Sequence, residues 1–215
     1  MKTKAAVAFE PNKPLEIVEL DLAAPRKGEV LVEIVASGVC HTDAYTLDGR
    51  NPGGYFPVVL GHEGAGIVRE VGGNVHGLKP GDHVITCLSV FCGHCEDCLT
   101  GHMSLCQNPE TKRGPDDEPR LAHNAQLVQQ FANLSSFAEQ MLVHEHAIVK
   151  IREDMPMDRA ALIGCAVTTG VGSVFHTAAV EPGTTVAVIG CGGVGLSCIN
   201  GAALAGAGRI IAVDT

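Results

Sequence analysis

Four cysteines lie close together between Cys92 and Cys106, in the spacing C-x2-C-x2-C-x7-C. Four thiolates in one short segment supply the ligands of a tetrahedral, closed zinc site. The spacers are rich in Gly, His and acidic residues, so we expect a loop folded around an ion rather than a helix or strand. A closed site leaves no position for a substrate, so this metal should stabilise the fold and not catalyse. The expected ligands are Cys92, Cys95, Cys98 and Cys106.

Two alternatives use the same four cysteines. A disulfide cluster is typical of secreted proteins, but the N-terminal stretch MKTKAAVAFEPNK has neither the apolar core nor the cleavage site of a signal peptide. An iron–sulfur cluster also takes four cysteines. The chain has nine cysteines in all, and those outside the cluster are scattered, which suits reduced thiols or metal ligands. We therefore favour zinc and a cytoplasmic location.

The composition narrows the classes of protein to which the chain can belong. Of its 215 residues, 46% are hydrophobic, so the chain can bury a sizeable core. A net charge of −9 without a basic stripe argues against a nucleic-acid partner. No apolar run reaches the roughly 20 residues that a membrane-spanning helix needs, so we expect no membrane association.

Short apolar or alternating runs, separated by Pro and Gly, occupy most of the first part of the chain. Such runs are typical of short antiparallel strands. The polar segment 108–124 is expected to be an exposed excursion. This part of the chain is therefore predicted to be mostly β, as in a partly open barrel. The expected strands are 5–9, 15–20, 30–36, 67–71, 83–86, 137–143 and 147–151.

The pattern changes in the last third of the chain. Two short, almost wholly apolar strands are expected there, of the kind found in parallel sheets. Their order, strand, glycine turn, helix and strand, predicts the first βαβ unit of a nucleotide-binding fold. A preceding apolar helix, 168–180, is expected to be buried. The expected elements are helices 157–163, 168–180 and 196–205 and strands 185–189 and 209–213.

Gly190, Gly192 and Gly195 form a G-x-G-x-x-G pattern directly after the first of these strands. Such glycines allow a tight turn, close approach of a pyrophosphate and close packing of helix on strand. The following helix N-terminus offers N–H groups to the phosphates. Asp214 ends the second strand, where a carboxylate bonds ribose hydroxyls and repels a 2′-phosphate, so the pattern favours NAD over NADP. The alternative is that small residues simply pack a helix on a sheet.

Three further residues with metal-binding side chains are ambiguous by themselves. His62 precedes Glu63 in GHEGAG, and a single histidine is more often a buried, hydrogen-bonded residue than a ligand. Cys40 and Cys165 are isolated thiols, which often behave as small buried hydrophobes. Local spacing does not bring these residues together, and only a fold can.

Taken together, these motifs resemble the zinc-dependent medium-chain alcohol dehydrogenases, over almost the whole chain. GHEGAG, followed by Gly72 and Val75, is similar to that family's zinc signature, and the four cysteines have its spacing. GCGGVG with Asp214 resembles its coenzyme fingerprint. CHTDAYTL is most similar to the class III branch, which oxidises the glutathione adduct of formaldehyde. The resemblance implies a mixed fold, an N-terminal GroES-like β-barrel catalytic domain followed by the start of an α/β Rossmann domain.

The resemblance also implies a domain division. Residues 1–155 would form the catalytic domain, with a zinc lobe at 88–107, and residues 156–215 would form linker helices and the first βαβ unit. Family members are longer, so we expect this chain to be truncated and its Rossmann domain incomplete. At full length the family resemblance implies a homodimer or homotetramer.

The resemblance assigns the catalytic roles. Cys40, His62 and Cys165 would hold a catalytic zinc with an open fourth position, so the chain would bind two zinc ions. Thr42 would hydrogen-bond the alcohol oxygen and pass on its proton. Asp43 would support the metal ligands, and Glu63 would tune the metal or transiently replace a ligand.

The coenzyme roles follow in the same way. His41 would contact the pyrophosphate, and Thr169 and Val194 would press against the nicotinamide. The full implied coenzyme-binding set is His41, Thr169, Gly190, Gly192, Gly193, Val194, Gly195 and Asp214.

The implied activity is the interconversion of an alcohol with its aldehyde or ketone, by hydride transfer to or from NAD. Zinc acts as a Lewis acid that lowers the pKa of the alcohol, and NAD carries the hydride. In the class III branch an Arg grips the glutathione carboxylate where this chain has Glu110, and an acidic partner is replaced by Asn51. Tyr45 stands where many relatives place a proton-relay His.

A carboxylate at Glu110 would repel an anionic adduct, so a simple primary or aromatic alcohol is the expected substrate. Two other functions stay open. One is oxidation of S-(hydroxymethyl)glutathione, and the other is a non-catalytic zinc-binding fragment.

Overall fold

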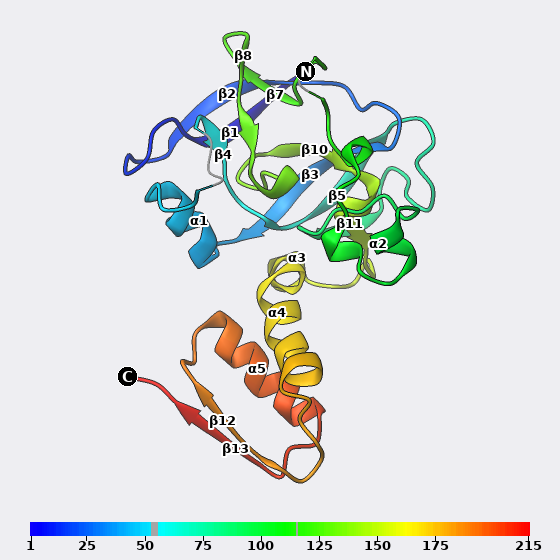
Figure 1. Ribbon diagram of the computed structural model, residues 1–215. Helices are drawn as coiled ribbons and strands as arrows, with labels where there is room; N and C mark the ends of the chain where they lie inside the picture. Colours follow the sequence, from blue (N-terminus) through cyan, green and yellow to red (C-terminus); the bar gives the residue numbers. More distant parts are fainter. Residues whose placement is uncertain (53–55, 115) are drawn as a thin grey trace. The chain divides into compact units, whose positions relative to one another are not determined.

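The computed structural model describes residues 1–52, 56–114 and 116–215. The chain divides into two compact units, Met1–Ala161 and Leu162–Thr215 (Figure 1). The boundary expected from the family resemblance lies after residue 155, just before the expected helix 157–163.

The first unit is built on two β-sheets, and its strand pairs are antiparallel except for β4 with β9. Strand order is β8-β7-β2-β1-β4-β9 in one sheet and β10-β3-β5-β6-β11 in the other. The prediction of short antiparallel strands is therefore confirmed. The strands are β1 (Lys2–Ala8), β2 (Glu16–Leu22), β3 (Glu29–Gly38), β4 (Val58–Val59), β5 (Glu63–Val71), β6 (His83–Thr86), β7 (Leu121–His123), β8 (Gln126–Leu127), β9 (Gln129–Gln130), β10 (Gln140–His144) and β11 (Ile148–Lys150).

The two sheets share one connecting segment and an apolar core. Ala6 of β1 donates its backbone N–H to the carbonyl of Phe137, and Ile34 of β3 donates to Glu139, so the residues before β10 bond to both sheets. Leu20 and Leu142, one from each sheet, are fully buried in the same cluster. Burial of such side chains is the main source of stability for this unit.

Short helices connect the strands. The α-helices are α1 (His41–Leu47), α2 (Glu96–Leu99) and α3 (Met157–Ala160), and the 3-10 helices are η1 (Met103–Leu105), η2 (Pro109–Thr111), η3 (Phe131–Asn133), η4 (Glu145–Ala147) and η5 (Ala161–Gly164). The expectation of a helix-free cysteine segment was wrong, because α2 contains Cys98 and η1 lies between Cys98 and Cys106. The segment 108–124 is also not a wholly exposed excursion, since Thr111 and Arg120 are buried.

The burial of that segment is explained by an ion cluster around Glu29, the first residue of β3. The Glu29 carboxylate accepts hydrogen bonds from Arg113 (2.6 and 3.0 Å), from Arg120 Nε (2.8 Å) and from the Arg26 backbone N–H (2.9 Å). Burial raises the pKa of the Glu29 carboxyl, but these hydrogen bonds and the charge of Arg120 outweigh it and lower the pKa to about 2. The cluster ties the segment to the sheet.

Replacing this carboxylate is expected to destabilise the first unit strongly. Glu29→Gln leaves two buried guanidinium groups without their shared counter-charge, so we expect the free energy of unfolding to fall by about 3 kcal/mol. Urea unfolding at pH 7 measures this. Glu33→Gln on the same strand is the matched control, because its ion pair with Arg69 is exposed and should contribute less than about 1 kcal/mol.

The same cluster predicts an acid dependence. The folded pKa of Glu29 is depressed to about 2 from an ordinary 4.5. Glu29 therefore contributes about 3 kcal/mol to the free energy of unfolding above pH 4.5. This contribution is lost as the pH falls through about 2. Glu29→Gln should flatten the fall in stability over this window; an unchanged acid profile in that variant would contradict the assignment.

The second unit contains one βαβ arrangement preceded by a helix. α4 (Ala166–Gly172) continues into a π-helix, η6 (Ser173–Thr177); β12 (Thr185–Ile189) and β13 (Arg209–Val213) pair in parallel, joined by α5 (Gly193–Leu204). Close packing of α4 on α5 depends on small residues, since a Cβ on Gly170 would lie 2.4 Å from that of Ser197. The expectation that helix 168–180 is buried was wrong for this chain, in which most of that segment is half-buried or exposed.

Within the described residues, no single helix has the length and apolar character to cross a membrane. One bent helix pair, Met157–Gly164 with Ala166–Thr177, passes the same criteria of length and composition when its halves are taken together.

Candidate functional site

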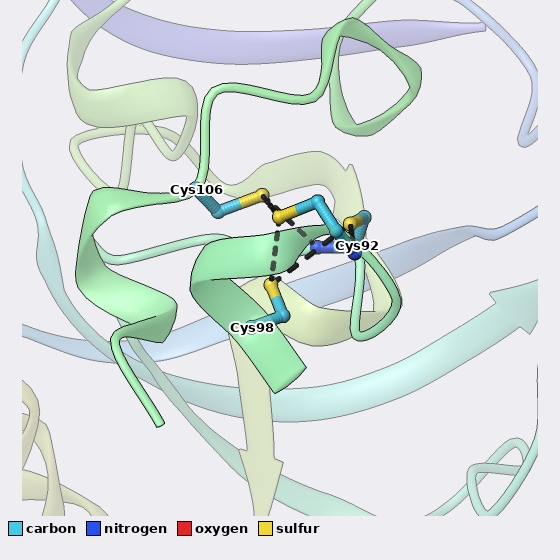
Figure 2. A group of neighbouring side chains, drawn as sticks. Cys92, Cys98 and Cys106 are labelled. Carbon is cyan, nitrogen blue, oxygen red and sulfur yellow. Dashed lines mark hydrogen bonds between the residues drawn. The ribbon is translucent and has the colours of Figure 1, made fainter. Parts of the chain in front are cut away.

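The four cysteines of the segment Cys92–Cys106 converge on one point, as Figure 2 shows for three of them. Their sulfur atoms all lie within 4.8 Å of one another, with separations of 3.4 Å (Cys95–Cys98), 3.8 Å (Cys95–Cys106) and 3.9 Å (Cys92–Cys98). Tetrahedral Zn–S bonds of about 2.3 Å place sulfur atoms about 3.8 Å apart, whereas a disulfide joins them at about 2.05 Å. The separations fit a four-thiolate metal site.

Local backbone geometry prepares these thiols for a cation. Cys92 Sγ accepts backbone N–H groups from His94 (3.5 Å) and Cys95 (3.3 Å). Burial raises the pKa of Cys92, but these hydrogen bonds outweigh it and lower the pKa to about 6. A backbone N–H from Cys98 favours the Cys95 thiolate, yet burial and the neighbouring thiols raise its pKa to about 12. Four thiolates therefore need a central positive charge.

A second group of potential ligands forms in the first unit where α1 meets β5. Cys40 is the residue before α1, His62 lies just before β5, and Glu63 is the first residue of β5. The ligand atoms of these three residues lie within 4.8 Å of one another. His62 and Glu63 are buried and Cys40 is half-buried, so a thiolate and an imidazole are presented together at the edge of the unit.

Asp43 holds this group together. Its carboxylate accepts hydrogen bonds from the backbone N–H of Cys40 (3.0 Å) and of Gly61 (3.0 Å), and it contacts His62 Nδ1 at 3.2 Å. Because Asp43 is only 3% exposed, it acts as an acceptor fixed within the protein. With Nδ1–H donating to Asp43, His62 presents Nε2 for metal coordination.

Cys40 and His62 influence each other's pKa. Burial raises the pKa of the Cys40 thiol, but hydrogen bonds from Thr42 and interactions with His62 outweigh it, so the pKa is lowered. Burial lowers the pKa of His62, but the hydrogen bond and charge of Asp43 outweigh it, so the pKa is raised. The lowered pKa of Cys40 favours the thiolate, which is the form that binds metal. The raised pKa of His62 favours the imidazolium, so the ring must release a proton when a metal binds.

The remaining predicted residues of the first unit lie on or near α1. His41 and Thr42 are exposed in its first turn, and Thr42 Oγ1 lies 3.5 Å from Cys40 Sγ. Asn51 donates to Thr46 Oγ1 (3.0 Å), and Tyr45 is 44% exposed. The Thr42 hydroxyl, which is predicted to transfer the proton, therefore lies beside the potential ligand Cys40.

The glycines of GHEGAG are required by close contacts. Gly61 has φ +89°, and a Cβ there would lie 2.5 Å from the ring of Phe137. A Cβ on Gly66 would lie 2.2 Å from the carbonyl oxygen of Glu33 on β3. Side chains at these positions would push His62 and β5 away from β3. The glycines therefore allow β5 to pair with β3 and keep His62 in place.

The second unit carries the other predicted residues. Cys165 is the residue before α4, and Thr169 is exposed within α4. Gly190 has φ +89°, and a Cβ on Gly195 would lie 1.8 Å from the Gly190 carbonyl oxygen, so the turn between β12 and α5 depends on both glycines. Gly192 precedes α5 and Val194 is exposed in its first turn.

Asp214 follows β13 beside this turn. Its carboxylate accepts hydrogen bonds from the backbone N–H groups of Cys191 (2.7 Å) and Thr215 (2.8 Å). The backbone hydrogen bond from Cys191 is the largest cause of a lowered pKa for Asp214. The acid is thus ionised and fixed next to the glycine turn.

A family profile described as the alcohol dehydrogenase GroES-like domain matches residues 26–153. The chain belongs to this family. The match confirms the predicted fold class, a GroES-like catalytic domain followed by an α/β segment. It contains the four cysteines and the Cys40–His62 group, so both candidate metal sites lie in the part of the chain that defines the alcohol dehydrogenase GroES-like domain.

Similar proteins include S-(hydroxymethyl)glutathione dehydrogenase of Escherichia coli, 51% identical over 100% of this chain and 59% of the relative. Among solved structures, an alcohol dehydrogenase zinc-binding domain protein from Burkholderia ambifaria has a TM-score of 0.90 at 39% identity. Benzyl alcohol dehydrogenase from Acinetobacter calcoaceticus has a TM-score of 0.89 at 35% identity. Each structural match covers 100% of this chain and 59% of the other. The chain thus spans 59% of the length of these relatives.

Two residues that support the GroES-like site had no signal in the sequence motifs. Thr86 Oγ1 donates to the His62 carbonyl (2.7 Å) and accepts from the Gly64 N–H (2.8 Å), which fixes the backbone around the histidine. Phe131 packs edge-on against the His62 ring, with centroids 5.5 Å apart. Thr86 ends an apolar strand, where a polar side chain pointing inward is the signal that could have identified it.

Proposed function

We propose that the protein is a zinc-dependent oxidoreductase that interconverts an alcohol and its aldehyde or ketone, with NAD as hydride carrier. The observation that carries this proposal is the Cys40–His62–Glu63 group, held by buried Asp43 at the edge of a GroES-like unit. Cys40, His62 and Cys165 would hold the catalytic zinc. Three ligands leave the open position that a catalytic zinc needs.

The chain's own residues would bind the alcohol and move its proton. A zinc ion in this site supplies Lewis acidity that lowers the pKa of the alcohol. Thr42 would accept a hydrogen bond from the alcohol and relay its proton, taking it up as its own hydroxyl proton passes on to water. Asp43 would keep His62 oriented, and Glu63 would tune the charge of the site. Tyr45 is exposed beside Thr42 on α1, so proton release to water suits this surface.

The second unit would bind the coenzyme. The turn from Gly190 to Gly195, including Gly192 and Gly193, would receive the pyrophosphate at the N-terminus of α5. Asp214 would bond the adenosine ribose, and its negative charge favours NAD over NADP. Thr169 and Val194 would contact the nicotinamide and His41 the pyrophosphate. This assigns residues 156–215 to the start of a Rossmann domain and residues 1–155 to the catalytic domain.

Cys92, Cys95, Cys98 and Cys106 would hold a second, structural zinc, which gives two zinc ions per chain. The four-thiolate geometry supports a closed site that excludes substrate. We further propose a cytoplasmic enzyme that assembles as a homodimer or homotetramer and acts on a small-molecule alcohol or aldehyde.

Substrate preference tests this function. We expect the protein with NAD to oxidise primary and aromatic alcohols with kcat/KM at least about tenfold above that for S-(hydroxymethyl)glutathione, about 1.4 kcal/mol. Glu110 presents a partly exposed carboxylate paired with His94 at 3.4 Å, and this negative charge opposes an anionic adduct. Steady-state NADH formation with both substrate classes measures the ratio, and Glu110→Gln should narrow it.

The second candidate activity is oxidation of S-(hydroxymethyl)glutathione. It is favoured by the similarity to S-(hydroxymethyl)glutathione dehydrogenase of Escherichia coli, which is 51% identical over the whole of this chain. A preference for the glutathione adduct over simple alcohols in the same assay would establish this candidate and contradict the first.

A non-catalytic zinc-binding role predicts a different metal content. Two zinc equivalents per chain, one of them removed readily by a chelator, support the enzyme. A single tightly held zinc without NADH formation for any alcohol would support the binding role.

A further inference from the structure

A hollow of about 460 Å³ opens on the first unit, beside the ion cluster of Glu29. Its volume lies in the range of pockets that bind small organic molecules. Cationic and amide side chains line much of it, and none of them is a ligand in either thiol site. These are Lys112, Arg113, Arg120, Gln129, Gln130 and Asn133.

The buried wall of this hollow carries excess positive charge. Arg113 and Arg120, whose side chains are 8% and 6% exposed, share the single buried carboxylate of Glu29. Asp117 also lines the hollow, but its carboxylate pairs with Arg26 at 2.7 Å and lies near the surface. Arg113 also lies 4.0 Å from the exposed carboxylate of Glu118. The buried positive charge of the two arginines still exceeds the single buried negative charge of Glu29, and such an excess is costly unless an anion approaches.

Of the two buried arginines, Arg120 forms the weaker interactions with negative charge. Its Nε bonds Glu29, but its two terminal nitrogens contact only neutral oxygens at long distances, Gln130 Oε1 at 3.3 Å and the Thr111 carbonyl at 3.4 Å. Burial lowers the pKa of Arg120, and the charge of Arg113 lowers it further against the pull of Glu29. The guanidinium therefore retains capacity for a stronger, charged acceptor.

The side chain of Gln130 is fixed beside Arg120 at the wall of the hollow. Its amide nitrogen donates to the carbonyls of Leu134 (3.0 Å) and Leu142 (3.1 Å), which leaves its oxygen toward Arg120. Lys112 adds an exposed positive charge at the rim. A guanidinium fork, amides and an ammonium group together match the chemistry of a carboxylate or phosphate group.

We propose that this hollow is a binding site for a small organic anion, whose carboxylate or phosphate group is held by Arg120 with Lys112 at the rim. The site is separate from the proposed chemistry at Cys40 and His62. The hollow is connected to the Cys40–His62 group through the chain, because Gln130 is followed directly by Phe131, which packs against the His62 ring.

Anion titration of the purified zinc-loaded protein tests this proposal. Inorganic phosphate and acetate are titrated by calorimetry at constant ionic strength, with chloride as the reference ion. We expect saturable binding of at least one of the two oxyanions, and the preferred probe tells phosphate from carboxylate recognition. Heats no greater than those of chloride for both probes would overturn the proposal.

Two variants locate the binding. Lys112→Gln should weaken the Kd of the bound oxyanion about fivefold, while Lys4→Gln, the same charge change on exposed β1, should leave it unchanged. Arg120→Gln should abolish binding if the variant folds, and the Lys112 comparison stands if it does not. Equal Kd values for Lys112→Gln and Lys4→Gln would place the anion elsewhere and contradict the site.

Discussion

Cys98→Ala is expected to remove one zinc equivalent and to lower the free energy of unfolding of the first unit by at least about 4 kcal/mol. Zinc bound to four thiolates stabilises small folded segments by an amount of this order or more, since the unfolded chain holds no preformed site. Cys98 Sγ lies 3.4 Å from Cys95 Sγ and 3.9 Å from Cys92 Sγ, so its loss removes one corner of the tetrahedron. Metal analysis and urea unfolding measure the two effects.

The control for this prediction is another thiol of the same unit. Cys87 lies before the cysteine segment, and its side chain contacts the Ser89 carbonyl at 4.0 Å rather than the other sulfurs. Cys87→Ala should keep the zinc content and change stability by about 1 kcal/mol or less. Retention of both zinc equivalents by Cys98→Ala would refute the structural metal site.

His62→Ala is expected to lower kcat/KM for alcohol oxidation at least about a thousandfold, which corresponds to about 4 kcal/mol of transition-state stabilisation. The variant loses an imidazole that Asp43 orients at 3.2 Å and that Phe131 and Thr86 fix in place. One zinc equivalent should be lost while the four-cysteine zinc is retained. NADH formation and metal content are measured on the same preparation.

His76→Ala is the matched control for the histidine, because His76 is exposed in a loop and uses only its backbone N–H to bond Glu145. It should retain activity and both metals. If His62→Ala turned over alcohol at the rate of His76→Ala, the catalytic role assigned to this group would be wrong.

The sequence predicted those parts of the molecule whose signals are local. Alternating apolar residues and turn residues predict the strands of the first unit. The bounds of β12 and β13 coincide with the expected ranges, because short apolar runs next to Gly define the bounds of such strands. The cysteine spacing likewise identifies four ligands within one segment. The fold class followed from the motifs and their resemblance to a known family.

The parts that local patterns could not predict depend on contacts between distant residues. Glu29 meets Arg113 and Arg120 across 84 and 91 positions, so a polar stretch that reads as exposed is in fact tied into the sheet. Thr86 reaches His62 across 24 positions for the same reason. Charged side chains of opposite sign pair in space, and composition alone does not tell which pairs form.

The hydrogen bonds of Asp43 have a consequence for the order in which metals enter the nascent protein. The four-cysteine ligands span only 14 positions, so they can capture an ion as soon as that segment exists, before the sheets close. The Cys40–His62 group requires Asp43 to bond Gly61 and His62, which stand 18 and 19 positions away and are held by the β3–β5 pairing. During synthesis, we therefore expect the four-cysteine segment to bind its metal first, and the Cys40–His62 group to bind one only after β3 and β5 have paired.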